Sequence, residues 1–120
     1  MSWDTVKTSG SWYVDAGSGM GPTLLKASEL GAYTLTDEGT FLAYKGRQEI
    51  DLVPIVTQGS NLLNVYSVIV CTKSTKQDLA NDLVDFLTSS DIQALIGRYG
   101  VTDYGKALFN PCAGMPEPTS

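Results

Sequence analysis

Short runs of β-branched and aromatic residues alternate along the chain with segments of helical character, and this alternation limits the fold more than any other feature. Such runs favour β-strands because branched and aromatic side chains fit a pleated, half-buried surface. Strands that alternate with helices predict βαβ units and a mainly parallel sheet flanked by helices, so we expect an α/β protein. The predicted strands cover residues 12–14, 32–35, 52–56 and 65–71.

A glycine-rich turn stands between the first predicted strand and the first predicted helix. Three glycines and Pro22 lie in residues 17–22, before a run of helix-forming residues that ends at Gly31, a residue typical of helix ends. Pro22 suits the first helical position, where its missing N–H has no partner to lose. After the second predicted strand, Thr36 is predicted to cap another helix, with Asp37 in its first turn.

Two further helices are predicted in the second half of the chain. Apolar side chains recur at i, i+4, i+7 and i+8 after Asp78, and Thr75 supplies a start signal three residues before it. A second helix is expected from Asp91 to about Tyr99, with Ser90 as its cap.

Charge and composition exclude several classes of function. The formal net charge is -5 and the isoelectric point is about 4.4, whereas nucleic-acid binding needs a basic face, so neither nucleic acid nor an anionic membrane is expected as a partner. No apolar stretch approaches the roughly 18–20 residues that cross a bilayer, and the first residues do not resemble a signal peptide. If the protein is exported, we expect its signal to lie outside this sequence.

The sequence contains no His and two Cys, and this inventory argues against an enzyme. Without His, the usual general base and the favoured zinc ligand are both missing. Cys71 and Cys112 form no CxxC pair, so neither a metal site nor a thioredoxin-type site is predicted. We expect Cys71 to be a small buried residue. The spacing neither requires nor excludes a disulfide between the two.

The glycine turn is the best local candidate for chemistry. Exposed backbone N–H groups at a helix N-terminus bind anions without a charged side chain, and Ser18 and Thr23 offer hydroxyl donors there. Thr34 and Thr36 alternate along the second strand and its exit, so they point in one direction and suit a bound oxyanion. A purely structural role, as a tight turn, a strand residue and a helix cap, explains the same residues equally simply.

Four segments of this sequence, in order, resemble TupA-type tungstate-binding proteins, the substrate-binding components of oxyanion ABC importers. They are WYVDAGSGMG at 12–21, GAYTLTD at 31–37, NVYSVI at 64–69 and YGKALF at 104–109. The resemblance covers the C-terminal half of that family, and the family's first half has no counterpart in this sequence. It implies a periplasmic-binding-protein-like (type II) fold, here partial, that closes over tungstate or molybdate.

The resemblance also implies a division of the chain. It makes residues 12–62 part of the second lobe and residues 63–110 the hinge strand with helices that return to the first lobe. Composition alone predicts a flexible lead-in at 1–11 and a loose, proline-rich tail at 111–120. A half-length chain of this kind exposes sheet edges, so two copies are expected to pair or swap. The full-length protein would work with an ABC permease in the periplasm or outside the cell.

In the family that this sequence resembles, the oxyanion is expected to be held by uncharged N–H and O–H donors. By resemblance, the contacts that remain in this chain are the backbone at Gly19 and Met20 and the hydroxyl of Thr34, with Thr36 as an orienting cap; neither a metal nor a cofactor is expected. The alternative is a small α/β interaction or regulatory domain that has lost its ligand. Glu38 favours this alternative because it stands where the resemblance leads us to expect Arg, and a carboxylate repels an anion.

Overall fold

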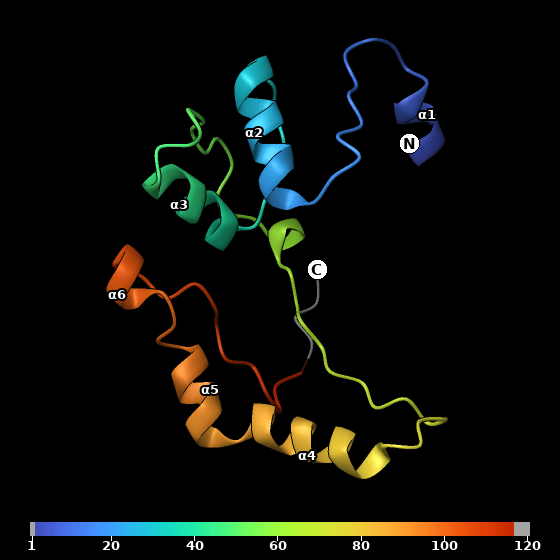
Figure 1. Cartoon of the computed structure of the whole chain (residues 1–120), viewed down its shortest axis with the longest axis vertical. Coiled ribbons are helices and arrows are strands. Elements are labelled where there is room, and N and C mark those ends of the chain that lie inside the picture. The colour runs from blue at the N-terminus through green and yellow to red at the C-terminus, as the bar shows by residue number, and fades with distance from the viewer. Residues whose placement is uncertain (1, 117–120) are drawn as a thin grey trace. The chain divides into compact units, whose positions relative to one another are not determined.

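A computed structural model describes residues 2–116, and all regular secondary structure in that range is helical (Figure 1). The helices differ greatly in length, and only three of them exceed two turns. They are α1 (Trp3–Lys7), α2 (Met20–Leu30), α3 (Glu38–Gly46), the 3₁₀ turn η1 (Ser60–Leu62), α4 (Gln77–Thr88), α5 (Ser90–Ile96) and α6 (Val101–Tyr104). Helix α1 lies within residues 1–11, which composition predicts to be a flexible lead-in.

The predicted parallel sheet is wrong for this chain, because residues 2–116 contain no strand. The four β-prone runs make no hydrogen-bonded ladder; the backbone hydrogen bonds outside the helices close turns and helix ends instead. Their side chains are largely exposed, with Tyr33 at 88 % and Ile69 at 84 %. A β-prone residue becomes a strand residue only when another strand pairs with it, and the described residues supply none.

The chain divides into two compact units, Met1–Val53 and Pro54–Ser120. In the first unit, α2 packs on α3. The buried apolar side chains are Leu24 and Ala27 from α2 and Ile50 from the segment after α3. The serine hydroxyl of Ser28 accepts a hydrogen bond of 2.8 Å from the backbone N–H of Asp51, which fixes that segment against α2.

Helix α2 begins at Met20, two residues before Pro22, the residue that the sequence places at the first helical position. The first hydrogen bond runs from Thr23 N–H to the carbonyl of Gly19 at 3.0 Å, so Pro22 lies in the first turn, where N–H groups have no helical partner. The predicted end is confirmed: Gly31 adopts the left-handed conformation with φ 59°. The N–H of Ala32 then donates to the carbonyl of Ala27 at 2.9 Å, which closes the helix.

The second unit is built on α4 and α5, which pack on each other. Three sequence predictions fail here. Thr75 does not cap α4, whose N-cap is Lys76 without a side-chain bond, and α5 is preceded by Ser89 rather than capped by Ser90. The helix predicted to run to about Tyr99 ends at Ile96, and α6 begins after Gly100, whose φ is 91°.

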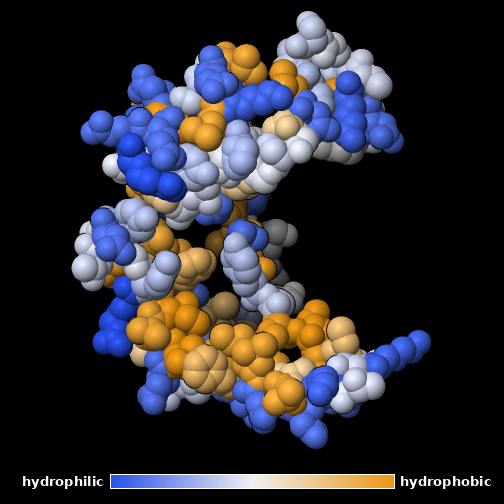
Figure 2. Space-filling model, viewed as in Figure 1, coloured by the Kyte–Doolittle hydropathy of each residue, from blue (hydrophilic) through white to orange (hydrophobic). Residues whose placement is uncertain are grey.

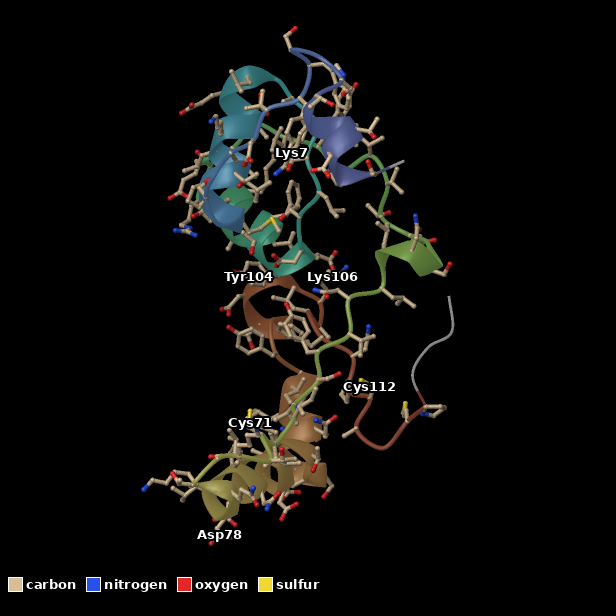
Figure 3. The ribbon with its side chains drawn as sticks, turned by 90° about the vertical axis from the view of Figure 1, so that its right-hand side faces the viewer. Lys7, Cys71, Asp78, Tyr104, Lys106 and Cys112 are labelled. Carbon is tan, nitrogen blue, oxygen red and sulfur yellow. The ribbon has the colours of Figure 1, made fainter. Side chains whose placement is uncertain are left out.

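An aromatic cluster joins the C-terminal segment to the rest of the second unit. The ring of Phe109 lies 6.2 Å from Tyr66 and 6.0 Å from Tyr99, between ring centres. Cys71 lies on the segment before α4 and Cys112 on the segment after α6 (Figure 3). Both thiols are free and exposed, so the prediction that Cys71 is buried is wrong, for the same reason that its strand is not formed.

Gly21 makes the close approach of α2 and α3 possible. A Cβ at this position would collide with the ring and hydroxyl of Tyr44 from α3, whereas a Cβ at Gly46 would meet nothing within 4 Å. We expect Gly21→Ala to lower the free energy of unfolding by about 1–3 kcal/mol, measured by urea denaturation. The control Gly46→Ala, also in a helix, should be neutral or slightly stabilising. Equal effects of the two substitutions would contradict this packing.

Candidate functional site

The N-terminus of α2 offers unengaged backbone donors. Its N-cap is Gly19, with φ -70° and ψ 178°, which carries no capping side chain, and no acidic residue lies in the first turn. Among the described residues, no carbonyl or side chain accepts a hydrogen bond from the N–H groups of Gly19, Met20 or Gly21. Such N–H groups, together with the positive end of the helix dipole, attract an anion.

The loop before α2 is held in place by its own side chains. The carboxylate of Asp15 accepts a hydrogen bond of 2.9 Å from the N–H of Gly17, whose φ is 59°. Thr23 donates its hydroxyl proton to the carbonyl of Gly19 at 2.8 Å, and the hydroxyls of Ser18 and Thr23 lie 3.5 Å apart. The Thr23 hydroxyl therefore fixes the turn and already has an acceptor for its proton.

The other long helices begin differently. The N-cap of α3 is Asp37, whose carboxylate accepts bonds of 2.8 Å from the N–H and the hydroxyl of Thr40. Thr36, the predicted cap, lies one residue too early, so that prediction is wrong: an ionised carboxylate is the stronger acceptor for helix N–H groups. Helix α4 begins after Lys76 and carries Asp78 in its first turn. Among α2, α3 and α4, only α2 begins without a carboxylate.

Thr34 and Thr36 lie in the same unit as α2. The hydroxyl of Thr34 is exposed and donates to the carbonyl of Leu35 at 3.4 Å, and that of Thr36 donates to the carbonyl of Asp37 at 3.1 Å. Within the described residues, no hydrogen bond joins either threonine to Gly19 or Met20. The four residues predicted as a site are thus all at or near the surface, and their meeting around one ligand stays a prediction.

Sequence reasoning missed Tyr44. It lies on α3, and its hydroxyl lies against Gly21 in the first turn of α2. The guanidinium of Arg47 stacks 4.7 Å above the Tyr44 ring. The facing glycine is the only sequence signal for this contact, because a tyrosine hydroxyl reaches a helix backbone only where no Cβ intervenes. Tyr44 thereby supports the helix end that carries the candidate donors.

A hollow elsewhere in the first unit has the wrong charge for an anion. It has a volume of roughly 450 Å³ and is lined by Ser28, Lys45, Gln48, Glu49, Ile50 and Asp51. The ammonium of Lys45 already lies 3.5 Å from the Asp51 carboxylate, and Glu49 adds a further negative charge. Among residues 2–116, no group of three His, Cys, Asp or Glu side chains is placed to hold a metal ion.

The family profile of bacterial extracellular solute-binding proteins matches residues 11–102. This chain belongs to that family. It is 39 % identical over 108 residues to the tungstate-binding protein TupA of Peptoclostridium acidaminophilum, an alignment that covers 87 % of this chain and 37 % of the relative. It is 38 % identical over 120 residues to a putative ABC transporter anion-binding protein of Haloferax volcanii, covering 94 % of this chain and 34 % of the relative.

The chain spans about a third of the length of these two relatives. No solved structure matches it. None of the helices in the described range is long and apolar enough to cross a membrane. The family and the TupA resemblance predicted from the sequence are confirmed, and the names of both relatives describe proteins that bind an anion.

The lack of a cap at α2 has a measurable consequence for stability. The backbone dihedral angles of Gly19 are accessible to any residue, and a Cβ at this position would meet no atom within 4 Å. We expect Gly19→Asp to raise the free energy of unfolding by about 0.5 kcal/mol, because its carboxylate would cap the free N–H groups. Gly19→Ala, which cannot cap, should lower it. Thermal melting would check both, and a lower melting temperature for Gly19→Asp would contradict the uncapped helix start.

Proposed function

We propose that this chain forms one side of an oxyanion-binding site in the substrate-binding component of an ABC importer, and that it is not catalytic. The observation that carries the proposal is the acid-free, uncapped N-terminus of α2, found in a chain 39 % identical to a tungstate-binding protein. The ligand class is a tetrahedral metal-oxide dianion, tungstate or molybdate. The permease of the importer is the proposed partner, and the periplasm or cell exterior the proposed location.

The chemistry of recognition rests on neutral donors. A dianion held by N–H and hydroxyl groups is selected by its size and by donor geometry, without a fixed counter-charge. We assign the N–H groups of Gly19 and Met20 as the main donors, with the exposed hydroxyl of Thr34 as a third. These groups make only part of a full coordination shell, so the affinity of this chain alone is expected to be weak.

A second function is favoured by the charges at α3. Asp37 caps this helix and Glu38 is exposed in its first turn, so two carboxylates occupy a helix start that otherwise attracts anions. A chain that had lost its ligand and served as an interaction or regulatory domain would tolerate this arrangement. The two functions differ in one measurable property, the response to tungstate.

Thermal unfolding in sodium tungstate, sodium molybdate and sodium chloride of equal ionic strength tests the proposal. A ligand that binds only the folded state stabilises it by about 1.4 kcal/mol at ten times its Kd. We therefore expect the melting temperature to rise with tungstate or molybdate at millimolar concentrations and to stay constant with chloride. No rise at any concentration would refute oxyanion binding and support the interaction domain.

Two substitutions at one position locate the site. Gly19→Asp places a carboxylate among the proposed donors and should abolish the shift caused by tungstate, through repulsion and through competition for the N–H groups. Gly19→Asn adds a capping group of the same size without charge, so it should weaken the shift less than Gly19→Asp does. An unchanged shift in both variants would place the bound anion elsewhere.

A further inference from the structure

The segment that follows α6 turns back along α5 (Figure 1). Near its start, the N–H of Leu108 donates a hydrogen bond of 3.0 Å to the carbonyl of Tyr99. Near its end, the N–H of Ala113 donates a hydrogen bond of 3.3 Å to Oε1 of Gln93. The partners move back along the chain as the segment advances, so residues 108–113 run antiparallel to α5. We call residues 108–113 the strap.

Two glycines allow the strap to lie close to the residues that it crosses. A Cβ at Gly97 would lie 2.8 Å from Cγ of Pro111, and a Cβ at Gly100 would lie 2.5 Å from Cγ of Leu108. Carbon atoms that are not bonded to each other do not approach so closely, so the two strap side chains occupy space that a larger residue at 97 or 100 would fill. The two glycines and the two strap residues have the same spacing in the sequence, which favours this one register.

The side chain of Gln93 connects the strap to both α5 and α4. Its Oε1 accepts the hydrogen bond from Ala113, while its Nε2 donates one of 2.8 Å to the carbonyl of Leu87 in the last turn of α4. Carbonyls in the last turn of a helix have no partner within that helix, so the Gln93 amide satisfies a group that α4 leaves open. One side chain therefore ties the strap to the contact between α4 and α5.

The strap also forms one wall of an apolar hollow. The hollow has a volume of roughly 250 Å³ and is lined by Leu95, Ile96, Tyr99 and Phe109. Phe109 belongs to the strap, and its ring centre lies 6.0 Å from that of Tyr99. Figure 2 shows hydrophobic side chains gathered over α4 and α5 in the same unit. If the strap leaves its place, the hollow loses the wall that Phe109 provides.

We propose that the strap opens and closes as one cooperative unit, and that its position decides whether α5 is fixed to α4 and whether the hollow exists. Among the described residues, the hydrogen bonds from the strap to the helices and their connections are those of Leu108 and Ala113. Phe109 is 42 % exposed even when the strap is closed. Segments with few buried contacts open locally, at a lower free energy than the helices they cover. This conformational change does not depend on anion binding at α2.

Amide hydrogen exchange followed by NMR tests the proposal on the whole chain. If the strap opens as a unit, the N–H groups of Leu108 and Ala113 have equal protection factors, lower than those in the middle of α4. Gln93→Ala removes the acceptor for Ala113. We expect exchange at Leu108 to rise with it by at least about fivefold, the factor that corresponds to the net contribution of one hydrogen bond, although the Leu108 N–H bonds to Tyr99.

The matched control is Gln77→Ala, which also removes a hydrogen bond from a glutamine side chain to a backbone carbonyl, that of Thr72, at the other end of α4. It should leave the exchange of both strap amides unchanged, and circular dichroism should show equal helix content in the two variants. A rise at Ala113 alone in Gln93→Ala would overturn the proposal, because the strap would then open piece by piece. An equal rise throughout α4 would also overturn it, because the whole unit would then unfold together.

A pair of substitutions tests the register of the strap. Gly97→Ala places a methyl group against Pro111 and should raise the exchange of both strap amides, as Gln93→Ala does. Pro111→Ala removes Cγ and Cδ, the atoms that this methyl group would meet, so adding it to Gly97→Ala should slow the exchange again. Exchange that stays fast in the double variant would contradict the contact of Pro111 with Gly97, on which the closed strap depends.

Discussion

Backbone hydrogen bonding decides which parts of this chain become regular structure. A helix pairs its N–H and carbonyl groups within one segment, so α2 and α4 need no distant segment to complete their backbone hydrogen bonds. A strand pairs its groups with a neighbour, and the β-prone runs at 12–14, 32–35, 52–56 and 65–71 find none among the described residues. The runs are therefore left without a ladder, and their apolar side chains, such as Tyr33 and Ile69, stay exposed.

The same constraint accounts for the small core. Among the described residues, the buried hydrophobic side chains are Leu24 and Ala27 of α2 and Ile50, which follows α3 in the chain. In a sheet, one face of each strand would bury its side chains against these helices. Because no sheet is present in residues 2–116, hydrophobic burial stops at the helix pairs.

The candidate site depends on a difference between helix ends. Every helix has a dipole whose positive end lies at its N-terminus. Helix α3 satisfies first-turn N–H groups with the carboxylate of Asp37, whereas α2 begins after a glycine without a capping side chain and leaves its first N–H groups free. The neighbouring side chains support this state without occupying it: Asp15 bonds to Gly17, and Thr23 bonds to the carbonyl of Gly19. Local hydrogen bonds thus keep the donors of Gly19 and Met20 available for an anion.

The sequence by itself determined the four principal helices, the end of α2 at Gly31 and the membership of the family, because helix periodicity, a left-handed glycine and a string of matching motifs are all local signals. It misplaced the caps, choosing Thr36, Thr75 and Ser90, since several neighbouring polar residues can compete for one helix start. The fate of the β-prone runs, the exposure of Cys71 and the contact of Tyr44 with Gly21 were decided only by tertiary structure. Each of these features depends on whether a distant segment pairs or packs with the residues concerned. The composition of one segment does not indicate which other segment will contact it.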